Sequence, residues 1–415
     1  MLYYLFTYLQ TEFDLAGSGL FQFLTFRAAI SVLISLIISL LLGGKFIRLL
    51  QRMQAGEVIR KLGLDGEEQK AGTPSMGGLI IITAVLVPTL LLAKLHNIYV
   101  LLILFVILSL GLVGFVDDYI KIYKKDKGGL AAKSKLIGQV FVGFIVGMAM
   151  FFHSDIYVRK DISANPNQVV QGEIRRSNPT TDRTIVEYKA ATTNVPFFKS
   201  YYFDYASPIT YFFGEDYRSY AWLLFVPFVM AIFIFLSNGN NLTDGMDGLA
   251  TGICAIIFIT FLLIAYLSGN AITARYLNIM HLPNASELVV FIAAAAGASI
   301  GFLWHNSFPA TVFQGDTGSL AMGGVIAGLG VMLRTEFLLP ILCGVFIIEN
   351  FSVMIQVAWF KYTKRKYGEG RRVFLMAPLH HHYQKKGYHE SKVVSRFWII
   401  GIMLAIITMV TFKIR

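Results

Sequence analysis

Long apolar runs separated by polar connections dominate the chain. The run from Ile98 to Val116 holds 19 residues without a charge, which is about the length that crosses a bilayer as a helix. The run at 319–333 is short and rich in glycine, which indicates a tilted or closely packed helix. The pattern predicts an all-α polytopic membrane protein with about ten transmembrane helices. These lie at about residues 20–43, 76–94, 98–116, 135–152, 220–237, 249–267, 287–304, 319–333, 337–360 and 394–412.

Composition supports this class of protein. Of the 415 residues, 55% are hydrophobic and 15% are charged, and the mean hydropathy is +0.61, whereas soluble domains carry about 25% charged residues. The cysteines Cys254 and Cys343 lie in apolar runs and provide neither a disulfide framework nor a metal-ligand spacing. The N-terminal segment lacks a basic stretch and carries Glu12 and Asp14, so we expect no cleaved signal peptide.

Basic residues gather in three connections. Six lie from Lys45 to Lys70, five from Lys121 to Lys133 and nine from Lys361 to Lys392, after the first, third and ninth runs. The positive-inside rule assigns these connections to the cytoplasm, so with ten helices both termini face the outer (periplasmic) side. The net charge of +11 therefore bears on membrane topology, and we expect no nucleic-acid partner.

The long connection at about 153–218 falls on the outer side, and its opposite charges cancel. Long loops translocate regardless of charge, so this segment agrees with the topology. We expect residues 1–415 to form a single integral membrane domain, with 153–218 as an outer insertion within it. No internal repeat stands out, which argues against a secondary transporter built from inverted halves.

Two adjacent carboxylates, Asp117 and Asp118, follow the third run where membrane meets water. Acids at a membrane edge are costly and indicate function, although a solvated helix end would have the same sequence. Lys121 lies four residues after Asp117, so a continuing helix brings acids and a base onto one face, either as a site or as a surface ion pair.

Further polar motifs lie in the same cytoplasmic connections. The segment Lys70–Gly78, with Thr73 and Ser75, opens the second run and suits an anion or a plain helix cap. The segment Asn238–Gly248 contains two Asp, three Asn and three Gly, and its oxygen ligands suit a hard cation, a sugar or a nucleobase edge. Asp316 precedes the Gly-rich run as a candidate Mg²⁺ ligand or a helix N-cap.

Three successive histidines, His380, His381 and His382, lie in the most basic connection. Adjacent imidazoles do not easily all reach one zinc ion, so phosphate binding or the positioning of a proton is favoured. Carboxylates, lysines, amides and imidazoles thus gather on the cytoplasmic face, and Mg²⁺ with Lys and His suits phosphoryl transfer. A site at the membrane edge implies one water-soluble and one lipid-borne substrate.

Four motifs occur in the order found in polyprenyl-phosphate sugar-1-phosphate transferases, and the chain resembles that family from Lys70 to Arg396. The triple His after Ala-Pro-Leu, together with Lys70–Gly78, resembles the phospho-N-acetylmuramoyl-pentapeptide transferase branch. The outer insertion is longer than this family usually carries. The four motifs are Asp117–Lys121, Asn241–Gly248, Gly315–Ser319 and Pro378–His382.

The resemblance implies transfer of phospho-N-acetylmuramoyl-pentapeptide from UDP-N-acetylmuramoyl-pentapeptide to undecaprenyl phosphate. UMP leaves, and lipid I forms in the first membrane step of peptidoglycan synthesis. The resemblance also implies Mg²⁺, a bacterial cytoplasmic (inner) membrane location and a homodimer. Asp316 matches the metal ligand, Asp117 matches the proposed base for the lipid phosphate, and Asp118 lies beside it.

Other positions match residues of the family's active site. Asp244 and His380 match catalytic positions, Lys70, Asp247 and Phe313 match the uridine pocket, and Lys121 and Lys133 suit the phosphates. Ser75 stands where relatives often have Thr. The substrate-binding residues that the resemblance implies are Lys70, Thr73, Ser75, Lys121, Lys133, Asn241, Asp247, Asn306, Phe313, His381 and His382.

Several alternatives stay open at the level of sequence. Attack by the lipid phosphate and a covalent route through an Asp nucleophile both suit these residues. Glu349, Asn350 and Gln356 in the ninth run either line a groove for the prenyl tail or bond between helices. A transferase using UDP-N-acetylglucosamine is disfavoured by the triple His. A transporter of an anionic solute is disfavoured because the polar residues crowd one face.

Overall fold

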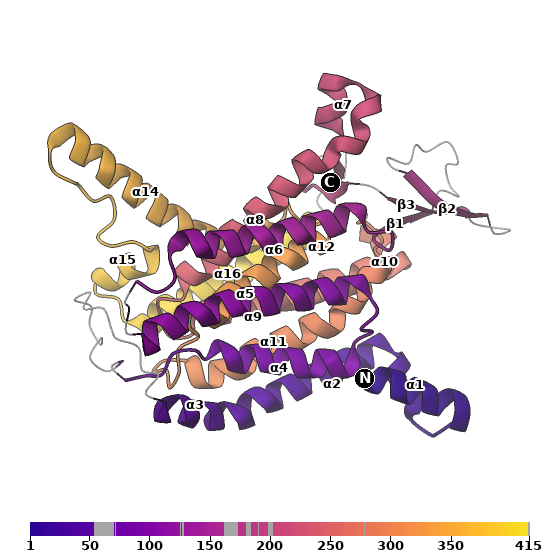
Figure 1. Ribbon diagram of the computed structural model, residues 1–415, viewed down its shortest axis with the longest axis horizontal. Helices are drawn as coiled ribbons and strands as arrows, with labels where there is room; N and C mark the ends of the chain where they lie inside the picture. The colour runs from indigo at the N-terminus through magenta and orange to yellow at the C-terminus, as the bar shows by residue number, and fades with distance from the viewer. Residues whose placement is uncertain are drawn as a thin grey trace.

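The computed structural model is a bundle of near-parallel helices with a small β-structure at one end (Figure 1). It describes residues 1–53, 70, 72–124, 126, 128–161, 173–179, 184–189, 191–197, 202–277 and 279–413. Some of the residues discussed above lie outside the described ones, namely part of the 153–218 insertion and the basic residues Arg60, Lys61, Lys125 and Lys127.

The predicted all-α polytopic class is confirmed. Within the described ranges, eight helical stretches are long and apolar enough to cross a membrane. They are Leu24–Arg52 (α2 Leu24–Ile37, η2 Ile38–Leu42 and α3 Gly43–Arg52), α5 Ile98–Tyr123, α6 Ala132–Phe152, Glu215–Thr243 (η4 Glu215–Ala221 and α8 Trp222–Thr243), α9 Leu249–Gly269, Asn284–Asn306 (η5 Asn284–Glu287 and α11 Leu288–Asn306), α14 Gly344–Tyr367 and α16 Glu390–Thr411. The other two predicted runs contain the shorter helices α4 Gly78–Leu92 and α12 Gly315–Met332.

The predicted start of the ninth run is wrong. The ninth run was expected to begin at 337, but α14 begins at Gly344 and the one-turn helix α13 Leu339–Leu342 precedes it. Leu338, Leu339 and Leu342 are buried inside the protein. Hydropathy does not distinguish apolar residues that face lipid from those that face protein, which explains the early start.

Several short elements have no counterpart among the predicted runs. Strands β1 to β3 form an antiparallel sheet in the order β1-β3-β2, and β4 pairs with β5. All five strands lie within the 153–218 insertion. The short elements are α1 Leu2–Phe13, η1 Ser18–Gln22, β1 Val158–Asp161, β2 Glu173–Pro179, β3 Thr184–Lys189, β4 Thr192–Asn194, β5 Tyr202–Asp204, α7 Ser207–Phe213, α10 Ala271–Leu277 and α15 Leu379–Lys385.

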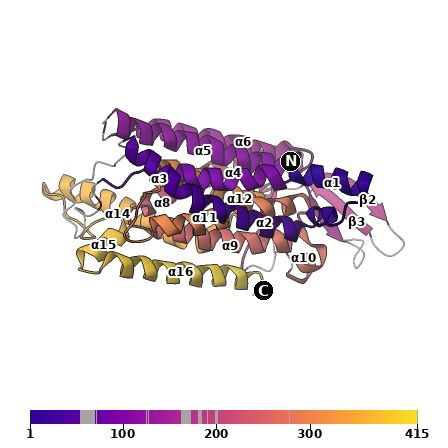
Figure 2. The ribbon, with the colours of Figure 1, turned by 90° about the horizontal axis from the view of Figure 1, so that it is seen from below.

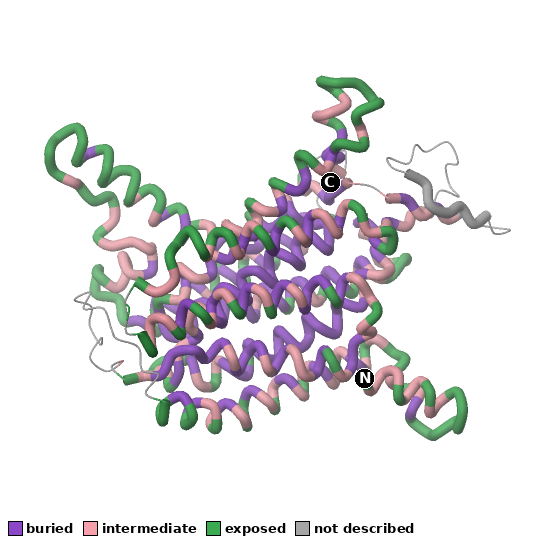
Figure 3. Tube along the Cα trace, in the orientation of Figure 1, coloured by how far each residue is buried: buried purple, intermediate pink, exposed green. Residues whose placement is uncertain are grey.

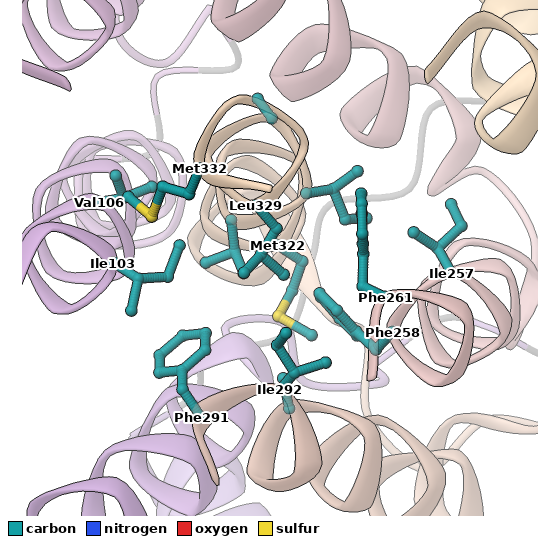
Figure 4. Packing of buried hydrophobic residues seen from close by; sticks show 14 of the residues in the cluster. Ile103, Val106, Ile257, Phe258, Phe261, Phe291, Ile292, Met322, Leu329 and Met332 are labelled. Carbon is teal, nitrogen blue, oxygen red and sulfur yellow. The ribbon is translucent and has the colours of Figure 1, made fainter. Parts of the chain in front are cut away.

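Helix α12 lies at the centre of the bundle. Every residue from Thr317 to Met332 is buried, and α4, α5, α8 and α9 all pack against it. Figure 3 shows that the inner helices are mostly buried and the outer ones more exposed. The close packing expected of the short Gly-rich run is therefore confirmed. Figure 4 shows its surroundings, in which Met322, Leu329 and Met332 meet Ile103, Val106, Phe258, Phe261, Phe291 and Ile292.

The outer helices expose apolar side chains, as membrane-embedded helices do. On α16, Ile399, Met403 and Ile406 are more than half exposed, which suits contact with lipid tails. Both chain termini lie toward the end of the bundle that carries the strands, whereas α3 and α15 lie at the opposite end (Figures 1 and 2). The shared side of the termini agrees with the even number of predicted crossings.

Candidate active site

Three carboxylates gather at the end of the bundle opposite the termini. Asp117 and Asp118 come from the last turns of α5, and Asp316 comes from the first turn of α12. One oxygen from each carboxylate lies within 4.8 Å of the others. Asp117 is fully buried and Asp118 is 3% exposed, so the alternative of a solvated helix end is excluded.

A glycine permits this gathering. A Cβ atom at Gly114 would lie 2.1 Å from the backbone oxygen of Asp316. Backbone cannot move away as the tip of a side chain can, so only glycine allows α5 and α12 to approach so closely at this level. The two acids that follow Gly114 by one turn therefore lie against the start of α12.

Asp118 caps α12 from the neighbouring helix. Its carboxylate accepts hydrogen bonds from the backbone N–H of Asp316 (3.1 Å) and from the N–H and hydroxyl of Thr317 (2.9 and 2.6 Å). The first N–H groups of a helix have no partner within it, and a carboxylate there also interacts favourably with the helix dipole. Asp316 was a candidate N-cap from the sequence, but Asp118 caps α12 instead.

Two lysines bridge the other two carboxylates. Lys121 Nζ lies 2.6 Å from Asp117 and 3.1 Å from Asp316, and Lys135 Nζ lies 2.9 Å and 2.5 Å from the same two residues. Asn241 donates an amide hydrogen bond of 2.8 Å to Asp316. The predicted grouping of acids with Lys121 and Asn241 is therefore present in the structure.

Lys135 was missed by sequence reasoning, which selected Lys133. Residues two apart on a helix point to nearly opposite sides, and Lys133 is exposed at the start of α6 whereas Lys135 faces the carboxylates. The sequence offers no signal for this choice, because the face that α6 presents to α5 is set only by packing.

The donor set fits a hard divalent cation. Three carboxylates oppose two ammonium groups, which leaves a net negative charge, and oxygen atoms are the ligands that such cations prefer. Both oxygens of Asp118 already accept hydrogen bonds from the start of α12. Asp117 Oδ1 likewise accepts the backbone N–H of Leu130 at 2.7 Å. Asp316 contacts the side chains of Lys121, Lys135 and Asn241, so it is the residue that would hold a metal ion.

A second cluster joins three distant parts of the chain. Lys70 Nζ lies 2.7 Å from Asp247 and 2.6 Å from Glu390, and Glu390 also accepts the backbone N–H of Asp247 at 2.7 Å. Burial opposes the charge of Lys70, but the two carboxylates outweigh it and raise the pKa of Lys70. The ammonium group lies 6.0 Å from the ring centroid of Phe313. This cluster unites the three residues predicted for the uridine pocket.

Glu390 is a second residue that sequence reasoning missed. It is buried in the first turn of α16. An acid at this position is a common signal for a helix start, so its sequence context indicates nothing more.

The histidines form a third cluster. His380 is fully buried and its ring centroid lies 4.2 Å from that of His381. Burial and the neighbouring His380 lower the pKa of His381 to about 3, so His381 is neutral at physiological pH. His382 accepts a hydrogen bond from the backbone N–H of Leu375 at 3.1 Å.

The Asn241–Gly248 segment connects all three clusters. Asn241 contacts Asp316, Asp247 contacts Lys70, and a Cβ atom at Gly245 would lie 2.3 Å from His380 Nε2 and 3.1 Å from His381 Nε2. Asp244 lies between these points, directly after the end of α8. This segment, rich in Asn, Asp and Gly, therefore contacts all three clusters.

Phe313 and Asn306 form hydrogen bonds that hold the loops around the site. Phe313 donates its N–H to Pro74 and accepts that of Gly77 (2.9 and 2.8 Å), which places buried Ser75 and half-buried Thr73 beside Phe313. The amide of Asn306 accepts the hydroxyl of Thr251 at 3.0 Å and donates to Val312 at 2.9 Å. Asn306 thus shapes the 307–314 loop, and both ends of its amide are engaged.

Similarity to known proteins agrees with this geometry. A family model described as glycosyl transferase family 4 matches residues 184–334. A pattern described as phospho-N-acetylmuramoyl-pentapeptide-transferase signature 1 matches residues 70–82, the segment that holds Lys70, Thr73 and Ser75.

Relatives match over the whole length. A phospho-N-acetylmuramoyl-pentapeptide-transferase of Flavobacterium psychrophilum is 54% identical over 415 residues, covering 100% of both chains. The chain belongs to the phospho-N-acetylmuramoyl-pentapeptide-transferase family. Proteins of that name from Flavobacterium johnsoniae and Parabacteroides distasonis are 51% and 49% identical, again over 100% of both chains. The similarity therefore includes the 153–218 insertion as well as the helices that carry the site.

Proposed function

We propose that this protein transfers phospho-N-acetylmuramoyl-pentapeptide from its UDP carrier to undecaprenyl phosphate, releasing UMP and forming lipid I. The observation that carries the proposal is the cluster of Asp117, Asp118 and Asp316 with two lysines, in a chain that is similar over its full length to transferases of that name. Carboxylates and lysines beside one another suit phosphoryl transfer, in which catalysis is mainly positioning and charge stabilisation.

Each cluster would serve one part of the reaction. Lys121 and Lys135 would bind the phosphate oxygens, and Asp117, held between them, would accept the last proton of the lipid phosphate. Lys70, Asp247 and Phe313 would bind the uridine, with the ring of Phe313 as a stacking surface. Bound Mg²⁺ would supply charge stabilisation at the diphosphate, with Asp316 as the metal ligand.

A groove beside α14 suits the prenyl phosphate. It has a volume of about 600 Å³ and an apolar wall that includes Val353, Val357 and Phe360. Lys361, Arg372 and Lys385 also line it, so a hydrocarbon chain and an anionic head group would both find complementary surfaces. Ala377, which also lines the groove, is three residues before His380 in the sequence, so the lipid phosphate would be bound near the histidines.

The cellular setting follows from the same proposal. We infer a bacterial cytoplasmic (inner) membrane location, with the active site on the cytoplasmic face where the basic connections lie. We also infer a homodimer and a single transferase domain, 1–415, in which 153–218 is an outer insertion.

Release of UMP by the purified protein tests the function. The assay contains undecaprenyl phosphate and either UDP-N-acetylmuramoyl-pentapeptide or UDP-N-acetylglucosamine, each with Mg²⁺ or with excess EDTA. We expect release only from the muramoyl substrate and only with Mg²⁺. Release from UDP-N-acetylglucosamine alone would overturn the substrate assignment, and no release from either substrate would overturn the enzymatic function.

Glu390→Gln is expected to weaken binding of the UDP substrate. The carboxylate of Glu390 holds both Lys70 and the backbone of Asp247, and hydrogen bonds to charged groups contribute about 1.5–3 kcal/mol. We therefore expect KM for the UDP substrate to rise about 10- to 100-fold with kcat nearly unchanged. Glu369→Gln, at an exposed carboxylate after α14, is the matched control. An unchanged KM in Glu390→Gln would remove Glu390 from the uridine pocket.

A further inference from the structure

An acid lies inside α14, within a membrane-spanning stretch. Glu349 is fully buried, and among the described residues no lysine or arginine forms an ion pair with it. A buried carboxylate is costly unless it is hydrogen-bonded or paired. The contacts of this carboxylate therefore indicate what it does.

The carboxylate of Glu349 caps α15. Its two oxygens accept the backbone N–H of Leu379 at 2.7 Å and that of His380 at 3.2 Å. The residue before this helix, Pro378, provides no side-chain hydrogen bond to the cap. The first N–H groups of α15 thus find their acceptor on α14, which fixes the short helix that carries the histidines.

The same carboxylate faces the ring of His380. Nδ1 of His380 lies 3.3 Å from Glu349 Oε2, which is close enough for an ion pair. Within the described part of the chain no protein group hydrogen-bonds either ring nitrogen. The Nε2 side of the ring faces Gly245, where an added Cβ atom would lie 2.3 Å away. The imidazole is therefore held between Glu349 and the Asn241–Gly248 segment.

The neighbouring polar residues of α14 bond to other parts of the protein. Asn350 donates to the backbone oxygen of Phe235 on α8 at 2.9 Å. Gln356 accepts the N–H groups of Val373 and Phe374 at 3.0 and 2.9 Å. The sequence left two alternatives open for these residues, a groove for the prenyl tail or bonds between helices. Glu349, Asn350 and Gln356 all bond to other elements, and of the three only Gln356 also lines the groove.

We propose that Glu349 is a positioning residue that orients His380 for the transfer reaction, an inference that rests on the proposed function. A carboxylate beside Nδ1 favours the tautomer with its proton on Nδ1. This leaves Nε2, which faces the Asn241–Gly248 segment, free to accept a hydrogen bond or a proton. Glu349 acts through His380 and does not itself touch the substrate. Its loss should therefore affect the rate of the reaction more than substrate binding.

The experiment compares wild type, Glu349→Gln, His380→Ala and the double variant in the UMP-release assay. Glu349→Gln is expected to lower kcat about 10- to 100-fold, the range typical for residues that orient an active-site imidazole, with KM for the UDP substrate changed less than about threefold. In the His380→Ala background the same substitution should have almost no further effect, because the two residues act as one unit. Asn350→Ala, adjacent on α14, is the matched control and should keep kcat near wild type.

The outcomes separate this inference from the proposed function. If wild type releases UMP and Glu349→Gln retains its kcat, or loses activity by the same factor with and without His380, the positioning role is overturned. If wild type itself releases no UMP, the proposed function fails. Thermal melting of each purified variant reports folding, and Glu349→Asp keeps the charge if Glu349→Gln does not fold. Its kcat should exceed that of His380→Ala, and equality of the two would count against the proposal.

Discussion

Asp316→Ala is expected to lower UMP release by at least about 1000-fold, since it removes charge stabilisation from phosphoryl transfer. The Asp316 carboxylate contacts Lys121, Lys135 and the amide of Asn241 at once. Without it, Asp117 alone opposes both lysines, and the metal site loses a ligand. The assay is UMP release at saturating Mg²⁺ and both substrates.

The variant should still fold. Asp118 caps α12 through the backbone N–H of residue 316 and through Thr317, and neither contact needs the Asp316 side chain. Yield after detergent extraction and thermal melting measure this, with Glu369→Ala as the control for loss of an exposed carboxylate. Full activity in folded Asp316→Ala would remove Asp316 from the metal site.

Gly114→Ala is expected to reduce kcat about 100-fold, because a displacement of about 1 Å in an active site costs that much. The added Cβ atom would meet the backbone oxygen of Asp316 at 2.1 Å, so α5 and α12 would have to separate. Asp117 and Asp118 would then move away from Asp316. Overpacking of this kind also costs about 1–3 kcal/mol of stability, which a lower melting temperature should report.

Gly111→Ala is the matched control on the same helix. Its Cβ atom would meet Ile82 Cδ1 at 2.7 Å, and the end of an isoleucine side chain can turn aside. We expect activity within about threefold of wild type, since rotamer changes are cheap compared with backbone movement. Equal losses in the two variants would show that the α5–α12 approach at Gly114 has no special importance for the site.

The class of protein and the residue types at the site could be predicted from the sequence. Apolar runs of about 20 residues have few alternatives to a membrane helix, because backbone groups in lipid need hydrogen-bond partners and a helix provides them within one segment. Asp117, Asp118, Asp316 and Asn241 were candidates from the sequence, because acids and amides at the edge of membrane helices often mark a functional site.

The separate contacts of these residues became apparent only from the packing of the helices. Asp118 accepts the N–H groups of α12, whereas Asp117 contacts the lysines, although the two residues are adjacent in the chain. The choice of Lys135 over Lys133 depends on which face of α6 packs against α5. Glu390 and Glu349 acquire their roles from partners 320 and 31 residues away in sequence. Local patterns record the periodicity of one helix, but the partner across a helix contact is set by packing, which a single sequence does not display.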